Sequence, residues 1–276
     1  MAFLADSVSG GRLEPESLGA FLIDADGSGR RRVVRAGGFL QCLSWSADGQ
    51  RLMFVRMTAD ATHASYQIGI ASVDHGSEVL LREPFPSQPC PTWSPDGGRV
   101  AFFGEPTSEG GWPLMVMNAD GSNPRQLGAA RYVPGHVAWS PDGRRLLAET
   151  YAQSHLVSVD ASTGAQLGDL TPTGHNWAPA WSPDGTRIAW VSQQGGRPEI
   201  WVMNADGTAP HALPRVIPET GGFGDGEPSW SPDGERIAFT RLTGASVIIS
   251  VRLDGTDPKV MTPPGIQGRE ATWRPR

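Results

Sequence analysis

One short motif recurs along the whole chain and constrains its fold more than any other feature. A tryptophan followed by a Ser-Pro-Asp-Gly turn, or by the variant Ser-Ala-Asp-Gly, occurs five times, and a sixth copy, ATWRPR, ends the chain. The six template tryptophans, at successive spacings of 48, 46, 42, 49 and 43 residues, are Trp45, Trp93, Trp139, Trp181, Trp230 and Trp273. This period matches four strands of about six residues with their connections, which makes one blade of a β-propeller.

Each repeat is typical of two successive β-hairpins. An apolar stretch ends at the tryptophan, the turn follows, and an alternating strand such as 187–190 comes next. Proline suits the second position of a type I turn, aspartate caps backbone amides, and glycine adopts the positive φ that reverses the chain. A second turn ending in Asp-Gly recurs downstream in VMNADG and LIDADG. We expect this second turn to join the third and fourth strands.

The two ends of the chain complete one repeat between them. The last repeat contains only its first strand, whereas residues 1–36 supply further strands without a tryptophan template before them. We therefore predict an all-β fold, a six-bladed β-propeller of four-stranded antiparallel blades, closed by the C-terminal strand pairing with the N-terminal strands. The six blades account for residues 1–276, which predicts a single domain.

The WSPDG turn paired with VMNADG resembles the TolB-type β-propeller repeat, and the resemblance spans essentially the whole chain. It implies a propeller used as a partner-binding scaffold. Because propeller repeats also serve many unrelated activities, the resemblance indicates architecture rather than chemistry. TolB itself adds an N-terminal domain and a secretion signal, and we expect neither here because the six repeats use the whole length.

Composition excludes several classes of protein. Glycine (35) and proline (24) are abundant while charged residues are 19%, which excludes a helical bundle. The net charge is −6 and Lys259 is the only lysine, which argues against a nucleic-acid partner. No apolar run is long enough for a membrane span, and the N-terminus MAFLADSV lacks a signal pattern. We expect a soluble, cytoplasmic protein, or a periplasmic or secreted one if a signal has been removed.

Strand direction alternates within a blade, so the WSPDG and NADG turns share one face, the turn face. We expect turn aspartates such as Asp96 and Asp120 to cap backbone amides, because their spacing lacks the alternating oxygen ligands of a calcium loop. The opposite face, the loop face, carries the irregular connections, of which Pro214–Pro228 is the longest. Loops on a rigid scaffold carry binding groups, so the loop face is the expected interaction surface.

The residue three positions before each template tryptophan should lie on the innermost strand, beside the central channel. These six residues, which we call the channel positions, are Cys42, Cys90, His136, Ala178, Glu227 and Glu270. Five of them carry metal-ligating or acid–base groups. Residues expected at the channel mouth, near or just upstream of these positions, are His175, Asn176, Trp177, Asp225, Gln88 and Arg269.

Two interpretations of the channel positions stay open. Either a divalent metal ion is held by His136 with Glu227 and Glu270, or the two carboxylates form an acid–base pair in which proximity raises one pKa. Alternatively, the polar residues only solvate a water-filled channel, and the two cysteines are small buried side chains or merely adjacent thiols. No further cofactor is indicated.

These features predict a non-enzymatic binding module that presents its loop face and channel mouth to a protein or peptide partner. The alternative is an enzyme, with a metal-assisted lyase or hydrolase site at the channel mouth that acts on a carbohydrate or other small polar substrate. The sequence contains no G-x-S-x-G elbow, no H-E-x-x-H motif and no phosphate loop. We expect a monomer.

Overall fold

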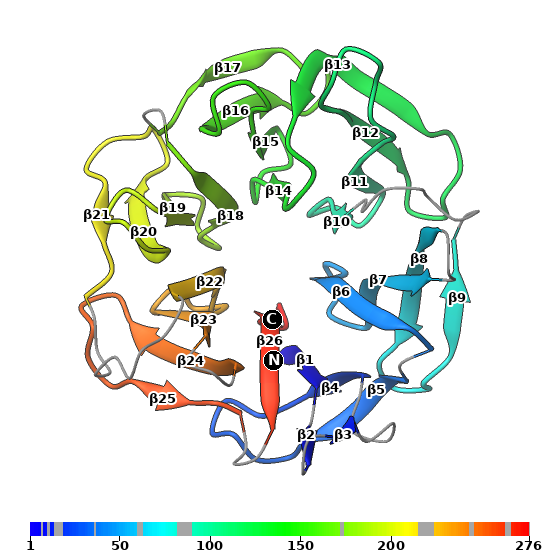
Figure 1. Cartoon of the computed structure of the whole chain (residues 1–276), viewed down its shortest axis with the longest axis vertical. Helices are drawn as coiled ribbons and strands as arrows, with labels where there is room; N and C mark the ends of the chain where they lie inside the picture. The colour runs from blue at the N-terminus through cyan, green and yellow to red at the C-terminus, as the bar shows by residue number, and fades with distance from the viewer. Residues whose placement is uncertain are drawn as a thin grey trace.

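The chain folds into blades arranged as a ring around a central axis (Figure 1). The computed structural model describes residues 1–6, 8–9, 12–13, 19–35, 37–59, 63–81, 90–171, 174–214, 224–242, 246–262 and 266–275. These residues form six four-stranded antiparallel sheets and a short ribbon of β2 (Val8–Ser9) and β3 (Arg12–Leu13). The predicted six-bladed β-propeller is confirmed.

Five blades follow the chain from the axis outward in sequence order. Blades 1 and 2 contain β6 (Phe39–Trp45), β7 (Arg51–Ala59), β8 (Ala64–Ser72) and β9 (Glu78–Leu80), then β10 (Thr92–Trp93), β11 (Arg99–Phe103), β12 (Trp112–Asn118) and β13 (Arg125–Tyr132). Blades 3 and 4 contain β14 (Ala138–Trp139), β15 (Arg145–Glu149), β16 (Leu156–Asp160) and β17 (Gln166–Asp169), then β18 (Asn176–Trp181), β19 (Arg187–Ser192), β20 (Glu199–Asn204) and β21 (His211–Ala212). Blade 5 contains β22 (Gly224–Trp230), β23 (Arg236–Leu242), β24 (Ser246–Arg252) and β25 (Lys259–Val260).

The sixth blade, the closing blade, combines both ends of the chain. Its strands, from the axis outward, are β26 (Gln267–Thr272), β1 (Ala2–Asp6), β4 (Gly19–Leu22) and β5 (Arg31–Arg35). In the β1–β26 pair, Ala2 lies opposite Thr272 and Leu4 lies opposite Arg269. Figure 1 shows β26 in red beside the blue β1, with both termini near the axis. The predicted closure of the ring is therefore confirmed.

Serine and aspartate side chains hold the WSPDG turns. In blade 2 the Asp96 carboxylate accepts a hydrogen bond from the backbone amide of Gly98 at 2.9 Å, and the Ser94 hydroxyl accepts one from the backbone amide of Arg99 at 2.9 Å. Gly97 adopts φ 69°, which the turn requires of a glycine. The hydrogen bond from Ser94 lowers the pKa of Asp96. The same serine and aspartate contacts recur in blades 1, 3, 4 and 5, so these aspartates serve the turns.

Apolar packing fills the seams between neighbouring blades. The five template tryptophans of blades 1 to 5 are between 5% and 8% exposed, and each lies in a cluster that spans two blades. A sixth cluster joins Phe3 and Phe21 of the closing blade to Ile248 of blade 5. Each seam therefore has its own apolar core, and the ring is held together by burial of apolar surface. The described residues include no helix that is long and apolar enough to cross a membrane.

Candidate functional site

The channel positions come together around one cavity at the ring axis. The cavity has a volume of about 380 Å³ and extends from the channel positions to the prolines of the WSPDG turns. Its walls include the template tryptophans and the turn prolines Pro95, Pro141 and Pro183. All six channel positions line it: Cys42, Cys90, His136, Ala178, Glu227 and Glu270. The six residues that precede the template tryptophans by three positions, one from each blade, thus lie around the same cavity.

Five channel positions adopt an unusual backbone conformation. The φ angles are positive at Cys42 (58°), Cys90 (31°), Ala178 (49°), Glu227 (56°) and Glu270 (50°). Register shifts occur in the same stretches of β6, β18 and β22, where one extra residue enters the inner strand. Such β-bulges re-aim side chains and remove a backbone amide from the ladder. Because left-handed φ is costly for residues other than glycine, its recurrence at equivalent positions marks a built feature of the ring.

Two of these bulges free a backbone amide from strand pairing, and each of these amides donates a hydrogen bond to a glutamate carboxylate. The backbone amide of Glu270 donates to Glu227 Oε2 at 2.9 Å, and the Thr240 hydroxyl donates to the same oxygen at 3.1 Å. The backbone amide of Cys42 in turn donates to Glu270 Oε2. The two glutamates therefore link blade 5, the closing blade and blade 1 in series. A buried amide without a partner would be unfavourable, so these contacts stabilise the closure.

The two carboxyl groups also influence each other. Burial, followed by the negative charge of Glu227, raises the pKa of Glu270 to about 8. Arg269, which contacts Glu270 Oε1 at 3.0 Å, and the amides of Cys42 and Leu43 act in the opposite direction. Near neutral pH Glu270 is therefore largely protonated beside Glu227, because burial and a neighbouring negative charge both disfavour its ionised form. A catalytic use of the two carboxyls stays a prediction.

His136 occupies the channel position of blade 3. Burial lowers the pKa of its imidazole, although the charge of Glu227 opposes this effect. The ring is thus neutral near pH 7, and it faces the carboxylate across the cavity. Ala178 occupies the channel position of blade 4, between His136 of blade 3 and Glu227 of blade 5. Its small side chain leaves the cavity open between these two residues.

The two cysteines are small buried side chains, as expected, but they form a disulfide, which corrects the alternative of merely adjacent thiols. Cys42 and Cys90 are joined with their Cα atoms 5.1 Å apart, so the bond links the inner strands of blades 1 and 2. Both are at least 96% buried, and Val55 packs with them. A disulfide provides no thiolate, so neither residue can act as a metal ligand.

The described residues predicted at the channel mouth do not line the cavity. Asn176 is fully buried, and its side chain accepts the indole N–H of Trp190 at 3.0 Å. Its amide nitrogen donates to the carbonyl of Gly174 at 2.9 Å. Asn176 therefore serves the core of blade 4. Trp177 packs, half-buried, against the cluster between blades 4 and 5.

Of the remaining mouth residues, the described ones lie upstream of the channel positions, toward the loop face. Asp225 forms a two-pronged ion pair with Arg241, with N···O distances of 2.7 and 2.9 Å. Arg269 lies over the Phe39 ring and donates to the carbonyl of Leu40. His175 is exposed. Gln88 lies outside the described residues.

The cavity does not fit a bound divalent metal ion. Among the residues that the structure describes, no group of three or more His, Cys, Asp or Glu side chains is placed to hold one. The disulfide removes two potential ligands, and the amides of Glu270 and Cys42 already use carboxylate oxygens of Glu227 and Glu270. No metal chemistry is therefore derived for His136, Glu227 and Glu270.

Sequence reasoning missed a set of arginines that pack on the template tryptophans. In four seams, the arginine that follows a template tryptophan by six positions lies over the template tryptophan of the next blade. In a fifth seam, Arg274 of the closing blade lies over Trp45 of blade 1. The pairs, with distances from guanidinium carbon to ring centroid, are Arg51–Trp93 (4.8 Å), Arg99–Trp139 (4.9 Å), Arg145–Trp181 (5.1 Å), Arg187–Trp230 (5.2 Å) and Arg274–Trp45 (5.6 Å). The arginine recurs in the sequence template, but its contact with the tryptophan of the next blade depends on how the blades are arranged in the ring.

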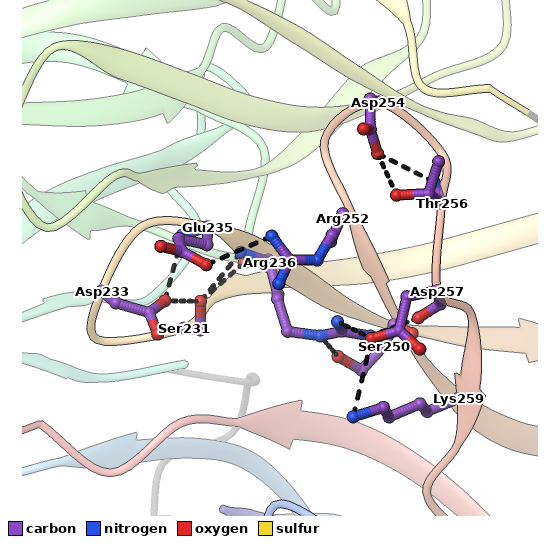
Figure 2. Close-up of polar contacts among 10 residues, drawn as sticks. All are labelled: Ser231, Asp233, Glu235, Arg236, Ser250, Arg252, Asp254, Thr256, Asp257 and Lys259. Carbon is purple, nitrogen blue, oxygen red and sulfur yellow. Dashed lines mark hydrogen bonds and ion pairs between the residues drawn. The ribbon is translucent and has the colours of Figure 1, made fainter.

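The seam between blade 5 and the closing blade departs from this pattern. Arg236 has the template position, but Figure 2 shows its side chain directed to Asp257 and Ser250 of its own blade. Its guanidinium lies 2.7 Å from Asp257 Oδ2 and donates to the Ser250 hydroxyl at 2.9 Å. Within the described part of the chain, Trp273 is therefore the one template tryptophan without an arginine over its ring.

Comparisons with known proteins agree with this architecture. A family model described as the TolB beta propeller domain matches residues 98–276. A Tol-Pal system protein TolB from Anaeromyxobacter sp. (strain K) is 33% identical over 109 residues, which cover 38% of this chain and 24% of that protein. The aligned region thus spans about a quarter of that relative.

Solved structures share the fold. TolB from Acinetobacter baumannii superposes with a TM-score of 0.81 at 18% identity, covering all of this chain and 66% of that one. An oligogalacturonate lyase in complex with manganese has a TM-score of 0.54 at 15% identity, covering 94% of this chain and 73% of that one. At these identities the likeness concerns the fold alone.

Proposed function

Because this chain belongs to the TolB beta propeller domain family, we propose that it is a non-enzymatic binding module that presents its loop face to a protein or peptide partner. The observation that carries the proposal is a set of exposed large apolar side chains on this face. Phe39, Tyr151 and Leu242 are 46%, 49% and 41% exposed. Each lies at the strand end or in the connection opposite the WSPDG turns.

The surroundings of these side chains are suited to a fixed docking surface. Phe39 is held under the Arg269 guanidinium, 4.1 Å from the ring centroid. Tyr151 packs edge-on against Trp112 with centroids 6.2 Å apart. Aromatic anchors that are already ordered lose little conformational entropy when a partner binds. Ordered, exposed aromatic groups on a rigid ring support recognition of a polypeptide surface.

An enzymatic role has less support. The lyase or hydrolase alternative requires a metal or another catalytic group at the channel mouth. The described mouth residues Asn176 and Asp225 are engaged in structural contacts, and the cavity does not fit a metal ion. A small polar ligand remains compatible with the cavity itself.

The disulfide bears on location. Disulfides persist in oxidising compartments and are rare in the cytosol. The bond between Cys42 and Cys90 therefore supports an oxidising compartment, such as the periplasm, over the cytoplasmic location predicted from the N-terminal residues. A monomeric state remains a prediction.

The test compares two sets of exposed apolar residues. One variant replaces Phe39, Tyr151 and Leu242 with serine, and the matched control replaces Val79, Leu167 and Val260 on outer strands, which are 61%, 55% and 57% exposed. A partner captured by the wild type is identified, purified and titrated against both folded variants by calorimetry. We expect binding to be lost in the loop-face variant and retained in the control. Equal binding by both variants would contradict the proposal.

A further inference from the structure

We infer that the ring opens at one seam, between blade 5 and the closing blade, and that the opening begins at the turn face beside Trp273. The closing blade then stays with blade 1 and separates from blade 5. This inference concerns the ring itself, so it goes beyond the proposed function of the loop face and is tested separately.

Two kinds of contact join neighbouring blades near the turn face. The first is the arginine over a template tryptophan, which is present in five seams. The second is a hydrogen bond from the indole N–H to a carbonyl of the neighbouring blade, made by Trp45 at 3.2 Å, Trp139 at 3.3 Å and Trp230 at 3.1 Å. Among the residues that the structure describes, the seam at Trp273 is the one that has neither contact.

Trp273 is also less buried than its counterparts. It is partly exposed, whereas the other five template tryptophans are buried. Its ring packs against the apolar cluster of the seam, and its backbone amide donates to the Ser229 hydroxyl at 3.2 Å. Three residues earlier, the amide of Glu270 donates to Glu227 at 2.9 Å. These contacts hold the inner part of the seam, so the turn-face end is where separation requires least free energy.

The last residues of the chain are held by blade 1. Arg274 lies over the Trp45 ring at 5.6 Å, and the Trp45 indole donates to the carbonyl of Thr272. Gly49 of blade 1 approaches Arg274 so closely that a Cβ there would lie 3.1 Å from its Nε. When the seam at Trp273 opens, these contacts keep β26 and the rest of the closing blade on blade 1.

The arginine that would cover Trp273 is present but is held inside blade 5. Arg236 donates to Asp257 Oδ2 at 2.7 Å and to the hydroxyl and carbonyl of Ser250 at 2.9 and 3.1 Å (Figure 2). At the turn position of Asp257, also with positive φ, blades 2 and 4 have the uncharged residues Asn123 and Ala209. In those two blades the template arginine lies over the tryptophan of the next blade. The carboxylate of Asp257 therefore accounts for the missing contact.

The experiment measures, by NMR, how fast each indole N–H exchanges with solvent in full-length protein that carries nitrogen-15-labelled tryptophan. Single Trp→Phe variants assign the resonances. Trp93 and Trp181 are internal references, because their indole N–H groups are also buried without an acceptor, while arginines cover their rings. We expect the Trp273 indole to exchange about tenfold faster than either, as for loss of a partly desolvated cation–π contact. Exchange as slow as that of Trp93 and Trp181 would overturn the inference.

Three variants test what controls the seam. Asp257→Ala combined with Ser250→Ala releases Arg236, and the exchange of Trp273 should slow to about the rate of Trp181. Asp254→Ala is the matched control, because it removes a carboxylate of the same turn that binds Thr256 and should leave Trp273 unchanged. Arg145→Ala uncovers Trp181, whose exchange should quicken about tenfold.

Circular dichroism and thermal melts establish that each variant is folded. Unchanged exchange of Trp273 in the folded double variant, or of Trp181 in Arg145→Ala, would show that arginine cover does not control the seam and would overturn the inference. Loss of partner binding on the loop face would leave these results unaffected.

Discussion

The backbone amide of Glu270 donates a hydrogen bond to the carboxylate of Glu227 at 2.9 Å, across the seam where the last strand of the chain meets blade 5. Glu270 repeats the arrangement one blade further on, toward Cys42. The same two side chains thus hold β26 in place and line one end of the cavity, which we call its floor.

Truncation of Glu227 should weaken the closure of the ring. Glu227→Ala removes the carboxylate acceptor, although the Thr240 hydroxyl, 3.1 Å from the Glu270 amide, retains part of the hydrogen bonding. We expect a loss of about 1–2 kcal/mol in the free energy of unfolding, and a smaller loss for Glu227→Gln, which keeps an acceptor. Urea denaturation of both variants measures the difference. An alanine variant as stable as the wild type would contradict the assigned contact.

Stability should fall as pH rises from about 6.5 to 8. The pKa of Glu270 is raised from 4.5 to about 8 in the folded protein, so the folded state binds more protons than the unfolded state in this range. Burial raises the pKa of Glu149 to about 7, which acts in the same direction. The lowered pKa of His136 affects stability only below its unfolded value of 6.5. The lowered pKa of the Met1 amino group makes stability rise with pH below its unfolded value of 8.0, and so opposes the two carboxyls in part.

Melting temperatures measured at pH 6.5, 7, 7.5 and 8 test this dependence. Glu270→Gln should flatten the slope, and the double variant with Glu149→Gln should flatten it further. A wild-type melting temperature that rises across this range would show that the two carboxyls do not control it.

The disulfide should stabilise the ring substantially. Cys42 and Cys90 are 48 positions apart, and closing a loop of this size contributes about 4 kcal/mol in the chain-entropy account. Replacing both cysteines with serine should therefore lower the free energy of unfolding by about this amount. Unreduced protein, unfolded in guanidinium, should react with no thiol reagent. Titration of two thiols under these conditions would contradict the bond.

Arginines stacked on template tryptophans should contribute more than arginines in exposed ion pairs. Arg145 lies 5.1 Å from the Trp181 ring centroid, whereas Arg252 forms an exposed pair with Glu235 at 3.3 Å. We expect Arg145→Ala to cost about 0.5–2 kcal/mol and Arg252→Ala close to nothing. Parallel denaturation of both variants decides the point, and equal losses would count against a role for the stacked pairs.

The tryptophan spacing was sufficient to predict the ring, its six blades and its closure. Each template turn encodes its own hairpin through local chemistry, and the incomplete repeats at the two ends can be completed only by each other. The template also placed Glu227, Glu270 and His136 around one axis, because equivalent positions of a cyclic repeat face the same channel.

Features that depend on three-dimensional context could not be predicted in this way. One extra residue in β18 lies between Trp177 and Ala180, so the alternation of side chains changes there and Asn176 turns into the core. The pairing of Cys42 with Cys90 was visible only as a shared template position, because a spacing of 48 residues gives no sign of contact. The path of Arg236 depends on Asp257, which comes from a different hairpin of blade 5.

The most direct test of the cavity floor is a titration of the side-chain carboxyl carbons of glutamate, followed by carbon-13 NMR of labelled protein. We predict one glutamate resonance that titrates near pH 8, disappears in Glu270→Gln and moves to lower pH in Glu227→Gln, because the charge of Glu227 raises the pKa of Glu270. A second resonance near pH 7 should disappear only in Glu149→Gln. If every glutamate titrates below pH 6, the two carboxyls do not meet in a buried floor and the account of the cavity is wrong.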